Sequence, residues 1–285
     1  MSELQTLMND LVIGETPRWH EGRLWFSHWG AQEIVAVDLD GNSEVVARAT
    51  TNIGYAIDWL PDGRLLLSGQ EGLLVRNEPD GPFSSYADLR GLSRHGWSEI
   101  VVDGRGNAYV NSVGFDFMAF LQGRADFAPG IIALVTPDGA VRQVADGIAF
   151  PNGMAVTPDN STLIIAESFT SKLTAFDIAA DGDLSNRRVW ADLGEGGDGD
   201  GICIDADGAV WTPMRDNACA RVREGGEVLH RIQLDRSCFA CMLGGSDGRT
   251  LFMMAATWRP ENPTGGPRTG KVLTARAPAP GVGWP

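Results

Sequence analysis

The sequence has few of the residues that build zinc sites, and it has no long apolar run. Its 285 residues include four cysteines, of which only two have C-x-x-C spacing, and four scattered histidines. A structural zinc site would therefore lack a second pair of ligands. We therefore expect the thiols to be reduced and unligated. No segment approaches the roughly 18 apolar residues of a membrane span, and the N-terminus, MSELQTLMND, lacks a basic segment followed by an apolar one. These absences predict a soluble, cytoplasmic protein.

Basic residues are also scarce. Lysine and arginine number 23 against 37 acidic residues, which gives a formal net charge of -14. Such a charge repels nucleic acid and anionic membranes. We expect a small-molecule substrate, no nucleic-acid or membrane partner, and a monomer or small homo-oligomer.

Helical periodicity is rare, and a repeated unit takes its place. Each unit has an apolar run, a tight turn with Asp-Gly or an equivalent pair, a second apolar run, then a third and often a fourth. The six units begin with ETPRWHEGRLWFS, YAIDWLPDGRLLLS, SEIVVDGRGNAYVN, NGMAVTPDNSTLIIA, DGICIDADGAVWTP and CMLGGSDGRTLFMMA. This pattern predicts an all-β fold, a six-bladed β-propeller with four antiparallel strands per blade, over residues 1–285 as a single domain. A β-sandwich is the alternative, but it has no reason to repeat a four-strand period six times.

The segment LMNDLVI, residues 7–13, precedes the first unit. We expect it to form a strand of the last blade and so to close the ring.

Alignment of the units on their turns defines a common position at the start of each innermost strand, here called the channel position. It is occupied by Tyr55, Ser98, Asn152, Asp200 and Ala240, and Glu15 lies one residue away in the first unit. Because innermost strands line the channel, Glu15, Asn152 and Asp200 are expected to converge. Two carboxylates and an amide carbonyl are hard oxygen donors that suit Ca²⁺, Mg²⁺ or Mn²⁺. Asn-Gly and Asp-Gly pairs are also common in turns, so a purely structural role is the alternative.

Three motifs occur in order: GETPRW near the start, FPNGMAVTPD in the middle and DGDGICIDADGAVW later. With them the chain resembles the senescence marker protein (regucalcin), gluconolactonase and luciferin-regenerating enzyme family, from about Leu11 to the closing GVGWP. The resemblance implies a six-bladed propeller with one divalent cation in the channel, held by Glu15, Asn152 and Asp200. Ca²⁺ is the favoured ion, with Zn²⁺, Mn²⁺ and Mg²⁺ as alternatives.

The resemblance also implies an enzyme, a metal-dependent hydrolase that opens a sugar lactone or a related cyclic ester. In this hypothesis the cation polarises the carbonyl, water attacks, and Asp200 is the catalytic general base. Two other classes stay open. One is a lyase, isomerase or cyclase that uses the same cation, and the other is a non-catalytic propeller that binds a metal or a ligand.

The third unit departs from the family pattern. Many relatives have Arg-x-Asn-Asp where this chain has Gly96, Trp97, Ser98 and Glu99. We therefore expect a substrate other than a simple aldonolactone. A long aromatic insertion, residues 113–130, suggests an apolar substrate portion, although it could instead pack on its own blade. The expected substrate-contacting residues are Tyr55, Trp97, Ser98, Glu99, Phe115, Arg215 and Trp258.

Overall fold

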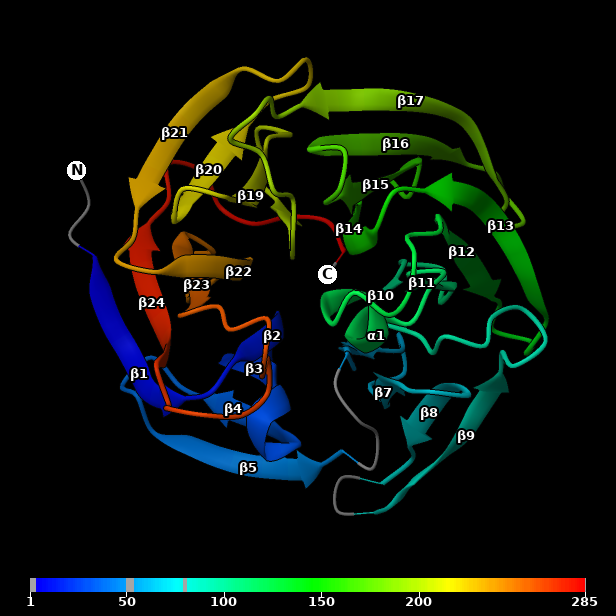
Figure 1. Cartoon of the computed structure of the whole chain (residues 1–285), viewed down its shortest axis with the longest axis horizontal. Helices are drawn as coiled ribbons and strands as arrows, with labels where there is room; N and C mark the ends of the chain where they lie inside the picture. The colour runs from blue at the N-terminus through cyan, green and yellow to red at the C-terminus, as the bar shows by residue number, and fades with distance from the viewer. Residues whose placement is uncertain (1–3, 50–53, 79–80, 285) are drawn as a thin grey trace.

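The computed structural model describes residues 4–49, 54–78 and 81–284. Six four-stranded sheets stand around a central channel like the blades of a propeller (Figure 1). In five blades the strands pair in chain order, and the first strand is the innermost. All the pairs are antiparallel. The predicted six-bladed propeller with four antiparallel strands per blade is confirmed.

The bounds of the strands follow the repeated units. The first three blades consist of β2 (Gly14–His20), β3 (Arg23–His28), β4 (Glu33–Val37) and β5 (Ser43–Arg48); β6 (Ile57–Trp59), β7 (Leu65–Ser68), β8 (Gly72–Arg76) and β9 (Phe83–Asp88); and β10 (Ile100–Val102), β11 (Ala108–Ser112), β12 (Gly130–Val135) and β13 (Val141–Ile148). The last three consist of β14 (Pro151–Val156), β15 (Thr162–Glu167), β16 (Lys172–Ile178) and β17 (Leu184–Asp192); β18 (Cys203–Ile204), β19 (Val210–Met214), β20 (Ala218–Val222) and β21 (Val228–Gln233); and β22 (Ser237–Gly244), β23 (Thr250–Ala256), β24 (Gly270–Arg276) and β1 (Gln5–Leu11).

The N-terminal strand closes the ring. β1 pairs with β24, so that Gln5 lies opposite Thr274 and Leu11 opposite Gly270. The first and last parts of the chain thus share one blade, and closure leaves only short edges at the rim. The strand expected over residues 7–13 is confirmed, with its start and its end two residues earlier.

Burial falls from the channel to the rim. Inner strands such as β10 and second strands such as β11 and β19 are buried throughout, because neighbouring blades cover both of their faces. The outermost strand β21 is exposed at alternate residues, as expected for a half-solvated strand. The hairpin turns match the predicted ones, since Gly63, Gly106 and Gly208 all have positive φ.

The C-terminal segment lies across one end of the channel. Trp284 exchanges two backbone hydrogen bonds with Val156, and the N–H of Val282 donates to the carbonyl of Ile204. These contacts are at the far ends of β14 and β18, and the C-terminus lies at the centre of the ring in Figure 1. The other end of the channel is where the inner strands begin.

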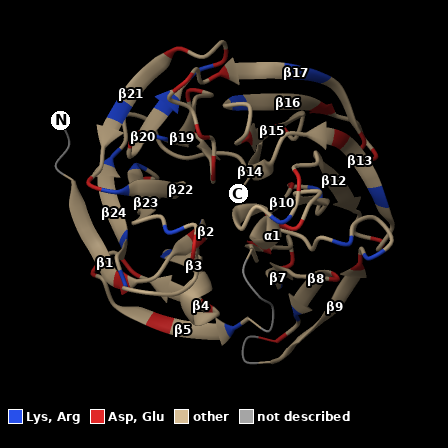
Figure 2. Cartoon of the chain, in the orientation of Figure 1, with Lys and Arg blue, Asp and Glu red and all other residues tan. Residues whose placement is uncertain are grey.

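Helices are few in the described part of the chain. A 3-10 turn, η1 (Trp29–Ala31), lies between β3 and β4, and α1 (Phe117–Leu121) lies in the insertion between β11 and β12. Neither is long or apolar enough to cross a membrane, and this holds for every helix of the described residues. Figure 2 shows charges of both signs on the outer strands β5, β13 and β17, so the acidic excess is not confined to one blade.

Candidate active site

A cavity of about 870 Å³ opens at the end of the channel where the inner strands begin. Its volume is within the range of small-molecule sites, roughly 300–1,000 Å³. All six blades contribute to its wall. Eight of the predicted site residues line it: Glu15, Trp97, Ser98, Glu99, Asn152, Asp200, Arg215 and Trp258.

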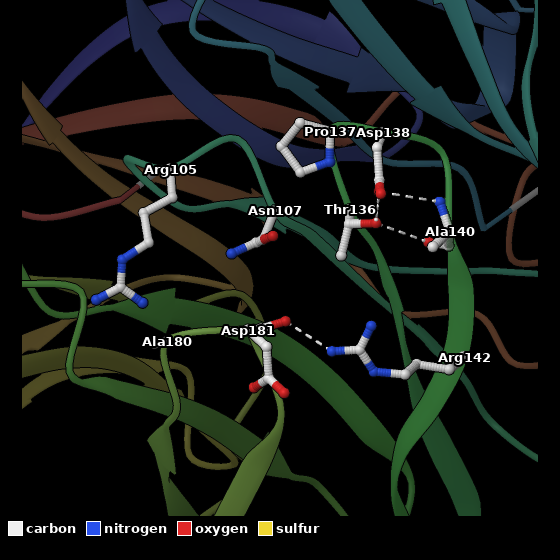
Figure 3. A pocket seen from close by; sticks show the side chains of 9 residues that line it. All are labelled: Arg105, Asn107, Thr136, Pro137, Asp138, Ala140, Arg142, Ala180 and Asp181. Atoms are coloured by element: carbon white, nitrogen blue, oxygen red, sulfur yellow. Dashed lines mark hydrogen bonds between the residues drawn. The ribbon is translucent and has the colours of Figure 1, made fainter.

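A second, smaller cavity of about 420 Å³ lies among the hairpin turns at the opposite end of the blades (Figure 3). Its charged groups are already engaged with the protein. Arg142 donates to the Asp183 carboxylate at 2.6 Å and to the Asp181 carbonyl at 2.6 Å, and Arg105 donates to the carbonyl of Ala179. We therefore place the candidate site in the larger cavity.

Glu15 is directed by an irregularity in β2. The register with β3 shifts between Glu15 and Arg18, and Thr16 takes a positive φ of 48°. Such bulges turn a side chain away from the regular alternation and are frequent near active sites. The Thr16 hydroxyl lies 3.1 Å from that of Ser27, which holds the bulge. Glu15 is buried, and one of its carboxylate oxygens accepts the Thr16 N–H at 3.3 Å.

Asn152 and Asp200 owe their places to the glycines that follow them. A Cβ on Gly153 would lie 2.6 Å from the carbonyl oxygen of Asp200, and one on Gly201 would lie 2.4 Å from the Cβ of Ala240. Neither glycine has positive φ, so neither is a turn glycine. These two pairs are therefore not the positive-φ turns in which Asn-Gly and Asp-Gly commonly occur. The glycines allow neighbouring inner strands to approach closely at the channel.

Ser168 fixes the amide of Asn152. The Asn152 Nδ2 donates to the Ser168 hydroxyl at 3.2 Å, and this hydroxyl donates to the carbonyl of Gly199 at 2.7 Å. The backbone carbonyl of Asn152 in turn accepts the Nδ2 of Asn111 at 2.8 Å. One serine therefore connects Asn152 on β14 with the residue that precedes Asp200.

The carboxyl groups of the cavity repel one another. Burial, followed by the nearby charges of Asp200 and Glu99, raises the pKa of Glu15 well above its usual value. Burial, followed by Asp198 and Glu99, likewise raises the pKa of Asp200, against the hydrogen bond of Asn152. Because like charges in one site disfavour ionisation, the arrangement favours a bound cation.

Glu99 belongs to a second buried charge group. Burial raises its pKa to about 7; Arg18 opposes this shift and Asp58 adds to it. The Nε of Arg18 lies 3.8 Å from Asp58, and its Nη2 donates to the carbonyl of Ile100 at 2.7 Å. A single guanidinium thus faces two buried carboxyl groups, so their charge is not balanced within the group.

Two predicted residues do not line the cavity. Tyr55 is 1% exposed, and its hydroxyl lies 3.1 Å from the carbonyl of His28 and 3.2 Å from that of Glu33. Its ring packs in the core against strands of the first two blades, so it is not part of the wall. Phe115 is 3% exposed and lies behind the wall, where its ring contacts Phe120 and Phe169.

Sequence reasoning missed several lining residues. Alignment on turns pointed to Ala240 in the last blade, whereas Cys238 and Phe239 line the cavity. A register shift between Cys238 and Ala240 in β22 explains the difference, because a bulge changes which residues face the channel. Phe150 lies two residues before Asn152 in FPNGMAVTPD, and this adjacency was the one signal that could have found it.

The four cysteines, Cys203, Cys219, Cys238 and Cys241, are buried and free. They lie at the boundary of the last two blades, where the Cys238 Sγ donates to the carbonyl of Ala240 and the Cys241 Sγ donates to that of Trp211. The neighbouring Cys238 and Cys241 thiols lower the pKa of Cys219 to about 5, and Cys219 together with burial raises the pKa of Cys238. The four thiols form no disulfide with one another, and their being unligated stays a prediction.

Comparison with known proteins assigns the family. The model of the SMP-30/Gluconolactonase/LRE-like region matches residues 13–257. The chain belongs to this family. Diisopropyl-fluorophosphatase of Loligo vulgaris is 31% identical over 229 residues, which are 71% of this chain and 70% of the relative. Regucalcin of Xenopus laevis is 28% identical over 279 residues, 89% and 88% of the two chains. A solved luciferin-regenerating enzyme shares the fold with a TM-score of 0.82 at 15% identity, covering 99% and 98%.

Membership of the SMP-30/gluconolactonase family is consistent with lactone hydrolysis and supports an enzyme. Among the described residues, no three side chains of His, Cys, Asp and Glu are grouped so that they could hold a metal ion. The candidate donor set has a different composition, two carboxylates and one amide. Its oxygen donors, the oriented Asn152 amide and the mutual repulsion of Glu15 and Asp200 fit a hard divalent cation.

Proposed function

We propose that the protein is a divalent-metal-dependent hydrolase that opens a lactone. One observation carries the proposal. Glu15, Asn152 and Asp200 come from three separate blades and line one cavity together, with the Asn152 amide held by Ser168. A cavity of this size and donor composition suits a small cyclic ester better than a polymer.

Glu15, Asn152 and Asp200 would hold one divalent cation, with Ca²⁺ favoured because every donor is oxygen. When bound, the cation would act as a Lewis acid toward the lactone carbonyl. Its charge would also relieve the repulsion that raises the pKa values of Glu15 and Asp200. The relatives named regucalcin and gluconolactonase support this assignment without fixing the ion.

Asp200 is the proposed general base. A water oxygen attacks the carbonyl carbon while the Asp200 carboxylate accepts its proton. The ring C–O bond then breaks, and the same proton passes from Asp200 to the leaving alkoxide oxygen. The product is an open-chain hydroxy acid. The hydrogen bond from Asn152 and the backbone N–H of Gly201 hold Asp200 in place during the transfer.

The test combines metal removal with one substitution. The protein is treated with EDTA, dialysed, and reloaded with Ca²⁺, Mg²⁺, Mn²⁺ or Zn²⁺, and proton release is followed over a lactone panel. We expect turnover only after reloading, and Asp200→Asn should lower kcat by about 10³-fold or more, since general base catalysis contributes roughly 10²–10⁴.

Asp198→Asn is the matched control. Asp198 lies in the same loop and lines the cavity, but it pairs with Arg215 at 3.3 Å and has no proposed role in proton transfer. Because the charge of Asp198 also raises the pKa of Asp200, Asp198→Asn should shift the pH dependence but lower kcat far less than Asp200→Asn. Metal-dependent stability without turnover of any lactone would overturn the proposal in favour of a binding propeller.

Hydrolysis of an organophosphorus ester or fluoride is a second candidate. The 31% identical relative is named diisopropyl-fluorophosphatase, and it covers 71% of this chain. Inclusion of diisopropyl fluorophosphate in the panel, with fluoride release as the signal, separates the two. A kcat/KM higher for the phosphorus compound than for every lactone would replace the first proposal by the second.

A further inference from the structure

One side of the cavity is an aromatic wall. Phe117 and Phe120 reach it from α1, and Phe150 and Phe169 reach it from the segments that flank β14 and β15. Phe150 and Phe169 stack at 4.7 Å between ring centroids, with 15° between the ring planes. The ring centroids of Phe120 and Phe169 lie 5.7 Å apart, and those of Phe117 and Phe150 lie 5.3 Å apart. These four residues are called the Phe wall below.

The Phe wall is supported from behind. The ring centroid of Phe115 lies 5.1 Å from that of Phe120, 5.9 Å from that of Phe150 and 6.2 Å from that of Phe169. The helix that carries Phe117 and Phe120 is capped, because the Asp116 carboxylate accepts the N–H of Ala119 at 2.9 Å. The insertion therefore packs on its own blade through Phe115 and still presents other rings to the cavity.

The first and last blades add more apolar surface. Trp29, Phe239 and Trp258 line the same cavity, and the Phe239 and Trp258 rings lie 5.8 Å apart. Phe169 and Trp258 remain 42% and 37% exposed. Large aromatic side chains left open to a cavity rather than packed away mark a ligand surface.

Three polar side chains of the cavity that could bind sugar hydroxyls are engaged with the protein, whereas the Trp97 Nε1 has no partner among the described residues. The Ser168 hydroxyl is held between Asn152 and Gly199, Ser237 donates to Asn217, and the Gln70 amide donates to the carbonyl of Arg94. Gly96 lines the cavity and supplies no side chain to it. A ring with several buried hydroxyls would leave hydrogen bonds unmade, which is unfavourable.

We infer that the substrate is a lactone that carries a long alkyl or aryl substituent and few ring hydroxyls. This inference rests on the proposed function, with the ring at Glu15, Asn152 and Asp200. The substituent packs on the Phe wall, where its burial removes apolar surface from water. The site thus discriminates by what is attached to the ring rather than by the ring itself.

The first test is a panel with one ring size, consisting of δ-valerolactone, δ-decalactone and glucono-1,5-lactone. The pentyl chain of δ-decalactone should raise kcat/KM by about 30-fold over δ-valerolactone, since each buried methylene contributes several-fold. Glucono-1,5-lactone should be the poorest of the three. A preference for glucono-1,5-lactone would overturn the inference and leave the hydrolase proposal standing.

The second test removes one ring from the Phe wall. Phe169→Ala should lower kcat/KM for δ-decalactone about 10-fold and leave that for δ-valerolactone nearly unchanged, whereas Phe169→Leu should lose less. Phe127→Ala is the matched control, because Phe127 contacts Phe115 and Phe169 but does not line the cavity. Equal losses for Phe169→Ala and Phe127→Ala would show a packing effect and contradict the inference. Phe117→Ala gives a second measurement if Phe169→Ala does not fold.

Binding separates the two proposals. The lactam 6-pentyl-2-piperidone cannot be turned over in the assay, and its binding is measured by isothermal titration calorimetry against unsubstituted 2-piperidone. Tighter binding of the pentyl compound, reduced by Phe169→Ala, supports the Phe wall even if no lactone is hydrolysed. Equal affinities for the two lactams would contradict the Phe wall as a binding site even if lactones are hydrolysed.

Discussion

The inner strands of blades four and five meet the channel differently from those of blades two and three. At Asn152-Gly153 and Asp200-Gly201 a polar donor is followed by a glycine, and the backbones of adjacent blades touch. The equivalent residues of blades two and three are Tyr55, which points into the core, and Ser98, which is followed by buried Glu99.

One repeat thus supports both a fixed site and a variable one. Close backbone contact leaves little freedom, so the donors on blades four and five are held where a cation would need them. Blade three instead carries the altered motif and the insertion with Phe117 and Phe120. Blades four and five are called the rigid half below. If close backbone contact positions Asn152 and Asp200, changes in the rigid half should have the largest effects.

The largest effect is expected from adding one methyl group to the rigid half. In Gly201→Ala the new Cβ would lie 2.4 Å from the Ala240 Cβ and 2.9 Å from its Cα, so blades five and six must separate. Overpacking of this kind costs about 3 kcal/mol of unfolding free energy. Urea unfolding followed by circular dichroism measures the loss, and lactone turnover should fall with it.

Gly196→Ala is the control for this change. Gly196 lies in the same loop, has no heavy atom within 4 Å of a Cβ, and is not in the positive-φ region. Its stability should stay within about 0.5 kcal/mol of the parent, as is usual for surface changes. A stable, active Gly201→Ala protein would show that close contact is not what places Asp200.

The next effect concerns the buried acid of blade three. Glu99 has its pKa raised from 4.5 to about 7 by burial, so below about pH 4.5 it is protonated in both the folded and unfolded chain. Between pH 4.5 and about pH 7, Glu99 is ionised in the unfolded chain but protonated in the folded one. The free energy of unfolding therefore falls as pH rises through this range, by roughly 3 kcal/mol in total. Because the desolvation penalty of a buried Gln is the same at every pH, the stability of Glu99→Gln relative to the parent should rise by the same roughly 3 kcal/mol between pH 4.5 and pH 8.

Urea midpoints from pH 4.5 to 8 in EDTA measure this dependence. The exposed Glu195→Gln variant controls for the loss of one charge. Parallel stability curves for the parent and Glu99→Gln would mean that Glu99 does not carry the dependence.

The architecture and the convergence of Glu15, Asn152 and Asp200 on one cavity could be predicted from the sequence because both follow from the repeat. A four-strand period fixes the ring, and a shared register brings Glu15, Asn152 and Asp200 to one end of it. The register argument failed where strands are irregular or side chains turn away. Tyr55 occupies the channel position yet packs in the core, and the bulge at Cys238 brings Cys238 and Phe239 to the cavity.

The aromatic wall shows a second limit of the sequence. The sequence predicts substrate-contacting aromatic rings in the insertion, residues 113–130, and indicates Phe115 as one of them. In the structure Phe115 supports the rings of Phe120 and Phe150, and the most exposed residue of the Phe wall is Phe169, some 50 residues away. Which ring faces out depends on packing between blades, and no pattern within one segment reports it.

The smallest effect tests how the amide of Asn152 is oriented. Ser168→Ala removes the hydroxyl that accepts from Asn152 and donates to Gly199. Loss of one such hydrogen bond is worth about 1 kcal/mol, and changes behind a metal ligand weaken affinity about 10-fold, so the Ca²⁺ dissociation constant should rise by about that factor. Titration calorimetry with Ca²⁺ on the EDTA-treated protein measures it directly.

Two further variants decide what that loss would mean. Ser168→Thr keeps the hydroxyl and should restore most of the affinity. Ser171→Ala removes a similar tether, since Ser171 donates to the carbonyl of Gly197 at 2.8 Å, but it does not contact Asn152. If Ser171→Ala weakened Ca²⁺ binding as much as Ser168→Ala, the serine would act by holding the loop rather than by turning the amide. An unchanged affinity after Ser171→Ala would assign the effect to the orientation of Asn152, and the rigid half would then fix the direction of its donors as well as their position.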